Sequence, residues 1–211
     1  GVLSDVTENQ RSQDELAARN KELMTLYRIS EVTLTATSTE RAYEEILREV
    51  CRATGFAIAV IERHDAHRGR LVVTASWGAP ADRIRPEMPV QGTLAGTAVR
   101  NVQAIAEFGA ANRAEMSDDV LQALGIHAYL AFPMAVGQEV VGALVLAHPS
   151  PMEPDRRLVR WAGSLANGVA QFLDRVGTPG SPARERGPIP PVGGGAAAGE
   201  PGARALRLFG V

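Results

Sequence analysis

The stretch from residue 92 to residue 147 constrains the fold of this chain more than any other part of the sequence. Gly92 and Gly96 stand four positions apart and open a short helix-like segment. A strand-like piece at residues 102–105 and a polar loop follow, and two apolar runs are then joined by a tight turn at residues 136–138. Two runs joined in this way form an antiparallel hairpin. The pattern predicts a small sheet under a helical cover, with a cavity where the cover meets the sheet.

Two long helices are predicted, one before the strands in the sequence and one after them. Residues 38–54 carry apolar side chains at helical spacing, and Gly55 follows where a helix end needs a left-handed residue. The candidates for the N-terminal cap of this helix are Thr37 in a capping box with Glu40, Ser38, and Thr39. The second helix is predicted from Pro154 or Asp155 to about residue 175, with a continuous apolar stripe.

The longer strands are predicted from runs of apolar and β-branched residues. They are residues 56–61, 71–77, 127–134 and 139–148. A polar turn joins the first two strands into one hairpin. Residues 78–90 contain three prolines and are expected to form an irregular connector.

An N-terminal helix is predicted over residues 12–35, and its apolar spacing suggests a coiled coil. Two rows of residues seven apart run along it, which are Leu16, Leu23 and Ser30, and Asn20, Tyr27 and Leu34. With the leucines at d, Asn20 falls at an a position, where paired asparagines favour a parallel two-stranded coil. Only two to three heptads are present, so the alternative is a solvated amphipathic helix that packs its last two turns on the domain.

Composition and charge exclude several classes of protein. The formal net charge is −2 and there is no dense run of Lys or Arg, so no nucleic-acid partner is predicted. Cys51 is the single cysteine, which excludes an internal disulfide and a cysteine-based zinc site. No apolar run reaches the length of a membrane span, and no signal peptide is visible. We therefore expect no membrane partner and a cytoplasmic localisation.

Four pieces of the sequence, taken in order, match the pattern of one known family. They are LYRISEVTLTATSTERAYEEILREVCRATGF, GTLAGTAVRNVQAIAE, GIHAYLAFPMAVGQEVVGALVLAHP and PDRRLVRWAGSLANGVAQFLD. In this order and spacing they resemble the GAF domain, a ligand-sensing and dimerising module of signalling proteins. The resemblance implies an α+β fold with a central antiparallel sheet of five or six strands. The long N- and C-terminal helices would lie on one face, and short helices and loops would cover the other.

The chain is expected to divide into three parts. Residues 1–22 would form a signalling or coiled-coil helix, and residues 23–176 the GAF domain. Residues 177–211 are rich in Gly, Pro and Ala and carry few large apolar residues, so they are predicted to be a disordered tail. Because the chain begins at Gly1 rather than Met, we also expect it to be a fragment.

The resemblance implies a ligand site between the sheet and a lid formed by residues 92–100 and 112–124. The candidate wall residues are Trp77, Leu94, Thr97, Ala98, Tyr129 and Phe132, and the polar candidates at the rim are Glu107, Asn112 and His127. Glu107 stands where many members of the family have Asp. An apolar cavity with a few convergent polar groups suits a small molecule. The same apolar side chains would equally fill a closed core.

These observations predict a non-catalytic sensory or regulatory module of a signal-transduction protein, such as a histidine kinase of a two-component system. A small ligand would bind under the lid, and the flanking helices of a homodimer would carry the signal to a kinase, cyclase or transcription-activator domain. The alternatives are a dimerisation or spacer domain without a ligand, and a small enzyme of the same fold. Free methionine sulfoxide reductases of this fold use several cysteines, and one cysteine disfavours that enzyme. No metal site and no cofactor are predicted.

Overall fold

The computed structural model describes residue 13 and residues 16–17, 19–20, 22–32, 38–108 and 125–176. The elements after the N-terminal helix are α2 (Thr39–Thr54), β1 (Ile58–Asp65), β2 (Arg70–Trp77), the short 3-10 helix η1 (Ala81–Arg83), β3 (Glu87–Pro89), α3 (Leu94–Asn101), β4 (Ile105–Phe108), β5 (Ala128–Val136), β6 (Glu139–His148) and α5 (Arg156–Val176). The predicted tail and the lid segment at residues 112–124 lie outside the described residues. Within the described ranges, every helix is too short or too polar to cross a membrane.

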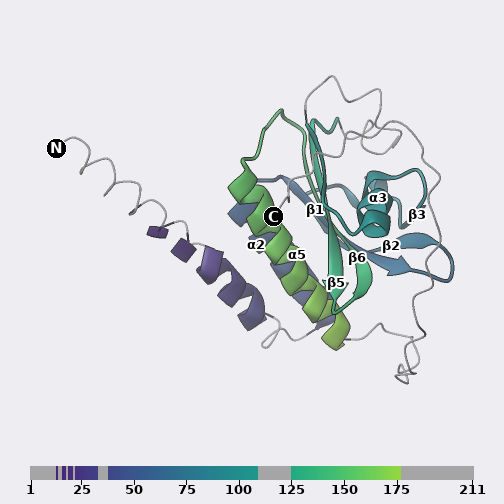
Figure 1. The fold of residues 1–211 in the computed structure, drawn as a ribbon, viewed down its shortest axis with the longest axis horizontal. Helices are drawn as coiled ribbons and strands as arrows, with labels where there is room; N and C mark the ends of the chain where they lie inside the picture. Colours follow the sequence, from purple (N-terminus) through teal and green to yellow (C-terminus); the bar gives the residue numbers. More distant parts are fainter. Residues whose placement is uncertain are drawn as a thin grey trace.

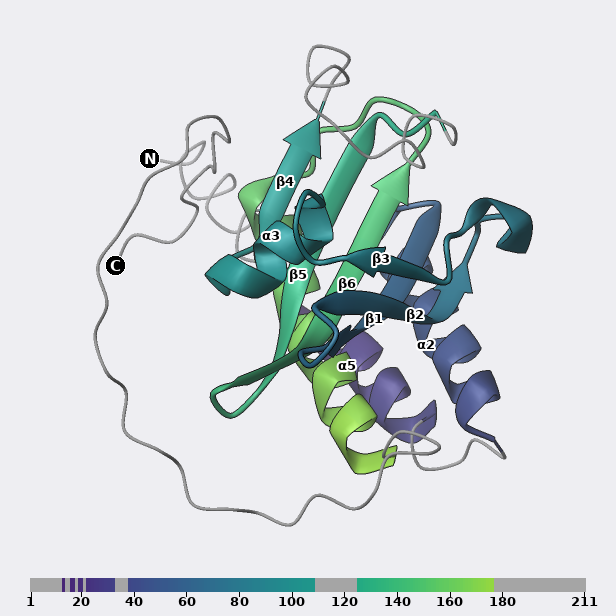
Figure 2. The same ribbon diagram turned by 90° about the vertical axis from the view of Figure 1, so that its right-hand side faces the viewer.

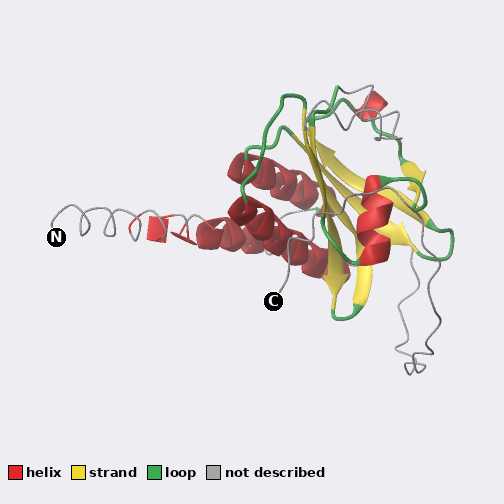
Figure 3. Cartoon of the chain, turned by 45° about the horizontal axis from the view of Figure 1, so that its top comes forward, coloured by secondary structure: helices red, strands yellow, loops and turns green. Residues whose placement is uncertain are grey.

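A single six-stranded antiparallel sheet organises the molecule. Its strand order is β3-β2-β1-β6-β5-β4, so the two hairpins meet where β1 pairs with β6. Helices α2 and α5 cover one face of the sheet, and α3 lies on the other (Figure 1). Figure 3 shows the same arrangement as a band of helices beside the sheet. The predicted fold class, with its terminal helices on one face, is confirmed.

Helix α2 forms where the sequence predicts it, because both of its ends are capped locally. The hydroxyl of Ser38 accepts a hydrogen bond from the backbone N–H of Arg41 at 3.3 Å, so Ser38 is the cap among the predicted candidates. At the other end Gly55 has a φ of 80°, and its N–H donates to the carbonyl of Cys51 at 2.8 Å. A left-handed residue in this position is a common helix end.

The strand predictions differ from the structure at three main places, and the first is β1, which continues to Asp65 beyond its predicted end at residue 61. Strand β4 occupies residues 105–108 instead of 102–105, because α3 continues to Asn101 and Val102 then adopts a left-handed conformation. Strand β3 lies inside the segment predicted as an irregular connector. It is only three residues long and contains Pro89, which a sheet accepts at its edge because an edge residue need not donate to a neighbour.

The side chains on the two faces of the sheet belong to two separate apolar clusters. One, which we call the helix-side cluster, joins α2 and α5 to strand residues such as Ile61, Leu130 and Leu144. The other, the lid-side cluster, joins α3 to the alternate strand residues, including Val60 and Val145. This separation follows from the period of two along a strand, which sends neighbouring side chains to opposite faces.

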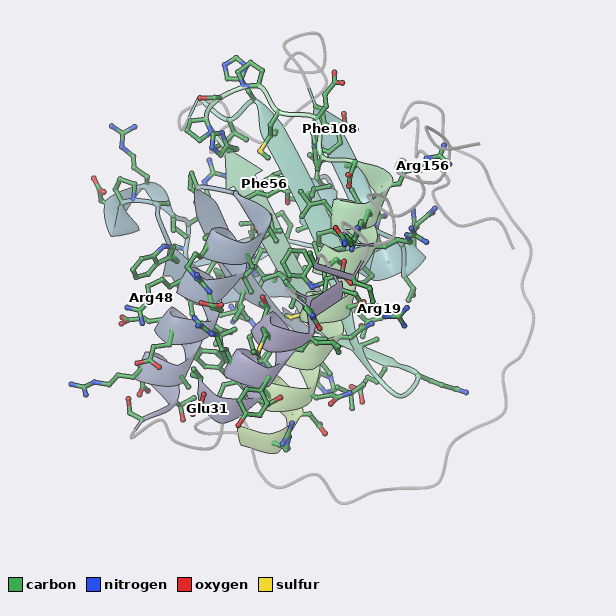
Figure 4. The ribbon with its side chains drawn as sticks, turned by 90° about the vertical axis from the view of Figure 1, so that its left-hand side faces the viewer. Arg19, Glu31, Arg48, Phe56, Phe108 and Arg156 are labelled. Carbon is green, nitrogen blue, oxygen red and sulfur yellow. The ribbon has the colours of Figure 1, made fainter. Side chains whose placement is uncertain are left out.

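The N-terminal helix packs outside α2 and α5 and is tied to both. Its Arg28 lies 3.8 Å from Glu49 of α2, and its Glu22 accepts a hydrogen bond from Arg157 of α5 at 3.2 Å. Thr25 and Ile29 are buried, each 3% exposed. Figure 4 looks onto this side, with the helix in front of α2 and α5. One face of this helix is thus part of the helical layer.

Val102 gives a first prediction for the fold. It ends α3 with a φ of 51°, and its side chain is 61% exposed. A left-handed backbone is costly for a β-branched residue and free of steric cost for glycine. We expect Val102→Gly to raise the free energy of unfolding by about 1 kcal/mol, because strain is relieved and little apolar contact is lost. Urea unfolding would measure this, and a less stable variant would contradict it.

Candidate functional site

The candidate site is the lid-side face of the sheet, where α3 lies across β5 and β6 (Figure 2). Thr93 caps the N-terminus of α3, because its hydroxyl accepts a hydrogen bond from Gly96 N–H at 3.1 Å and donates to the carbonyl of Pro89 at 3.1 Å. These two bonds fix the start of the helix against the end of β3. The Thr97 hydroxyl turns back along the helix and donates to the carbonyl of Thr93 at 2.9 Å.

Helix α3 approaches its neighbours closely because its inner face is made of small residues. Ala95 and Ala98 are 1% and 0% exposed and belong to the lid-side cluster. A side chain at Gly96 would overlap the carbonyl group of Val90. Gly96 therefore permits close packing, and the α3 contact with β5 and β6 is a filled core rather than an open space at these residues.

Of the nine predicted site residues, five come together on the lid side, whereas Asn112 lies outside the described residues and His127 lies just before β5. Leu94, Thr97 and Ala98 lie on α3, and Tyr129 lies beneath in the lid-side cluster. Glu107 of β4 is the direct cross-strand partner of Tyr129, and cross-strand partners share a face. Tyr129 is buried, whereas Glu107 is half-buried. The polar rim predicted at Glu107 thus adjoins the predicted aromatic wall.

The other two predicted wall residues, Trp77 and Phe132, lie on the opposite face, and their assignment is corrected. Phe132 is 2% exposed within the helix-side cluster, next to Gly163 of α5. Trp77 packs against the same cluster, with the guanidinium of Arg48 5.8 Å from its ring centre. Both residues support the helical layer and line no part of the lid side.

Sequence reasoning missed Glu62, the one charged residue that is fully buried in the described part of the chain, at 3% exposure. It pairs across the sheet with Val73 of β2 and Ala143 of β6, so its side chain is on the lid side. The strand that carries it was predicted to stop at residue 61. Extending the alternation of Ile58 and Val60 by one step would have placed Glu62 on this face.

Cys51 offers no reactive thiol to the site, because it lies in α2 on the far side of the sheet. It is 7% exposed, and burial raises the pKa of its thiol to about 12. A nucleophilic cysteine needs a lowered pKa and access to solvent. Cys51 therefore acts as a small apolar residue of the helix-side cluster.

This pKa predicts a loss of stability at alkaline pH. An unfolded cysteine releases its proton near pH 8.5, whereas folded Cys51 holds it to about pH 12. Between these values the folded state binds more protons, so the free energy of unfolding falls by up to about 1.4 kcal/mol per pH unit. Cys51→Ala should remove this slope in urea unfolding from pH 8 to pH 11. Equal slopes in the two proteins would contradict the burial of the thiol.

Solved structures with this fold come from both signalling proteins and enzymes. The GAF domain of an Acinetobacter phosphoenolpyruvate-protein phosphotransferase is 16% identical, with a TM-score of 0.63 over 74% of this chain and 94% of that one. The A. aeolicus nlh2 GAF domain in an inactive state is 14% identical, with a TM-score of 0.63 over 76% and 99%. The free methionine-R-sulfoxide reductase of Neisseria meningitidis, in complex with its substrate, is 14% identical, with a TM-score of 0.61 over 72% and 88%.

Identities this low show a shared fold and nothing about activity. No curated protein is significantly similar to the sequence. The family model of the GAF domain, by contrast, matches residues 36–174, which span α2 to α5 and all six strands. This chain belongs to the GAF domain family.

Proposed function

We propose that this chain is a non-catalytic regulatory module of a signal-transduction protein, which binds a small molecule on the lid side of its sheet. Binding changes the arrangement of the flanking helices in a homodimer and thereby controls an output domain such as a kinase, cyclase or transcription activator. The observation that carries the proposal is the placement of the two clusters. The same strands bear the lid-side cluster on one face and the helix-side cluster on the other.

The two faces of the sheet are one residue apart along each strand, because adjacent residues of one strand belong to different clusters. In β1, Ile61 faces the helices and Glu62 faces the lid side. A ligand that displaces α3 or changes the surroundings of Glu62 acts on the backbone that α2 and α5 rest on. The ligand must bind one helix arrangement better than the other, because only differential affinity shifts an equilibrium.

The enzyme alternative receives no support from the cysteine. Thiol chemistry on methionine sulfoxide needs an accessible thiolate and a resolving thiol, and Cys51 is a buried single cysteine. We expect no reduction of free methionine sulfoxide by the purified protein with added dithiothreitol. Turnover above the thiol background would overturn the non-catalytic assignment and favour the enzyme.

The test of the ligand site is a thermal-shift screen with nucleotides, amino acids and other small metabolites. A ligand at one hundred times its dissociation constant stabilises the fold by about 2.7 kcal/mol, which is an easily measured increase in Tm. Each stabilising compound is then retested on Thr97→Leu, which adds bulk on the lid side, and on the control Arg48→Ala, which alters an exposed residue of α2 on the helix side.

The proposal expects the shift to be lost in Thr97→Leu and kept in Arg48→Ala. A shift that survives in Thr97→Leu but disappears in Arg48→Ala would place the site on the helix side and contradict the proposal. If no compound raises Tm, the dimerisation or spacer domain is the better description.

A further inference from the structure

Glu62 places an acidic group inside the apolar layer of the lid side. Its side chain is 3% exposed. Its cross-strand partners, Val73 of β2 and Ala143 of β6, pack in or against the lid-side cluster. Val60, two residues earlier on the same face of β1, belongs to that cluster and is 8% exposed. The carboxyl group therefore lies among apolar side chains on the side of the sheet that carries α3 (Figure 2).

The strand pairing is irregular on both sides of Glu62. One bulge leaves Thr74 of β2 without a residue opposite it in β1, and a second leaves Val141 of β6 without one in β5. Gly142 lets β6 approach the carbonyl oxygen of Glu62 more closely than a residue with a Cβ could. Bulges are frequent beside functional sites, where they change the direction of a side chain. The irregular pairing of both hairpins thus occurs next to the buried carboxyl group.

Acidic side chains outnumber basic ones on this face. Among the described strand residues, those that point to the lid side include the acids Glu62 and Glu107 and one basic side chain, His64. Helix α3 adds Arg100, which is exposed. Within the described residues, the sheet therefore presents a mainly apolar surface with an excess of carboxyl groups.

The arginines nearest to Glu62 in the strands point to the other face. Arg63 follows Glu62 directly, and its charge acts on Tyr43, which is buried in the helix-side cluster. Arg70 precedes the lid-side residue Leu71 and pairs with Glu87 at 3.2 Å. Since neighbouring residues of a strand alternate between faces, neither guanidinium group balances the carboxyl groups of the lid side.

We infer that the ligand of the lid side is a small organic cation, a protonated amine on an apolar body, and that Glu62 is the residue that selects it. The inference rests on the proposed function and adds the chemical class of the ligand and the group that recognises it. An ionised carboxyl group only accepts hydrogen bonds, so the N–H donors of an ammonium group suit it. The attraction is stronger among apolar side chains than in water, because the effective dielectric constant is lower.

The same face disfavours anionic ligands. A phosphate or carboxylate group close to Glu62 and Glu107 would meet charges of its own sign, and this repulsion opposes binding. The apolar residues around Glu62 would contact the carbon skeleton of an amine, as apolar walls do in most sites for small molecules. The inference therefore separates amines from the nucleotides of the thermal-shift screen, whose phosphate groups are negative.

Matched pairs of compounds test the charge of the ligand on the unaltered protein. Butylamine is compared with butanol, phenethylamine with phenethyl alcohol, and tryptamine with tryptophol, all in thermal-shift assays at pH 7, where the amines are protonated. We expect at least one amine, from these pairs or from the wider screen, to raise Tm while its neutral analogue does not. This comparison needs no variant, so it still decides the question if a substitution at Glu62 prevents folding.

Calorimetric titration with the stabilising amine then tests the role of Glu62. Glu62→Gln should raise its Kd at least about thirtyfold, since it removes one partner of a buried ion pair. The control is Glu153→Gln, which removes the same charge from an exposed loop and should change Kd by less than about twofold. Equal Kd values for Glu62→Gln and the unaltered protein would overturn the assignment of Glu62.

The screen separates a failure of this inference from a failure of the proposed function. If only neutral or anionic compounds raise Tm, or if each amine acts no better than its alcohol, the lid side binds a ligand of another class and the inference alone is refuted. If no compound of any class raises Tm, the proposed function and the inference are both refuted.

Discussion

Gly142→Ala should be among the most destabilising single substitutions in this domain, with a loss of about 3 kcal/mol or more in the free energy of unfolding. Gly142 lies in β6 opposite Arg63 of β1, and a methyl group there would overlap the carbonyl oxygen of Glu62. The obstacle is backbone in the central strand pair, so it cannot rotate away as a side chain would. The substitution forces β1 and β6 apart where the two hairpins join.

Gly163→Ala is the matched control for Gly142→Ala. A methyl group at Gly163 would lie 3.6 and 3.8 Å from two ring carbons of Phe132, which is ordinary contact. Because alanine is the better helix former inside α5, this variant should gain up to about 1 kcal/mol. Chemical denaturation of both proteins measures the contrast. Equal stability of Gly142→Ala and the unaltered protein would mean that β1 and β6 pair in another register.

Phe132→Ala should cost about 3 to 5 kcal/mol, the usual range for deleting a buried phenylalanine. Phe132 is 2% exposed in β5 and faces α5 in the helix-side cluster. A small domain has a total stability of about 5 to 15 kcal/mol, so a substantial fraction of this variant unfolds at moderate temperature. The loss should be equal with and without a lid-side ligand, since the residue lies on the other face.

Leu94→Ala provides the comparison for Phe132→Ala. Sequence reasoning placed both residues in one ligand wall, but Leu94 is half-buried on α3 at the lid side. We expect a loss of about 1 to 2 kcal/mol for Leu94→Ala, because less apolar surface leaves contact. Thermal unfolding of the two variants checks the order of the effects. A larger loss for Leu94→Ala would contradict the deeper burial of Phe132.

Sequence patterns located the hairpin of β5 and β6 well because its turn chemistry is local. Gly137 adopts a φ of 63°, a conformation that glycine accepts at no steric cost. Strand β6 occupies residues 139–148 as predicted. Helix α2 was predicted equally well, because Ser38 and Gly55 mark its two ends within the sequence. Such signals need no knowledge of distant parts of the chain.

The face of the sheet to which each strand side chain points was harder to predict, because the central strands are buried on both sides. Residues 128–132 of β5 are all buried, so no polar alternation indicates which side chains face the helices. Phe132 was misplaced for this reason. In β2 a bulge leaves Thr74 without a partner opposite it and changes the phase between Val73 and Ala75. A register shift of this kind moves every later side chain, Trp77 included, to the other face.

Other failures came from contacts between distant segments. Strand β3 is stabilised by its neighbours, with Val73 N–H donating to the carbonyl of Pro86 at 2.8 Å and with Arg68 and Arg70 each 3.2 Å from Glu87. None of this is visible in a three-residue segment with a proline. The sequence could have placed Glu62 on the lid side through the alternation of β1, but its burial comes from the lid-side cluster, to which α3 contributes residues distant in sequence.

The alternation of side chains along β1 and β6 has an evolutionary consequence. Residues that face the lid side and residues that hold the helices alternate along the same strands, so a substitution in one set can leave the other set unchanged. Under the proposed function, a lineage can thus change which ligand it binds and keep the way its subunits assemble. One scaffold of this design is able to serve many regulators without rebuilding its connection to the rest of the protein.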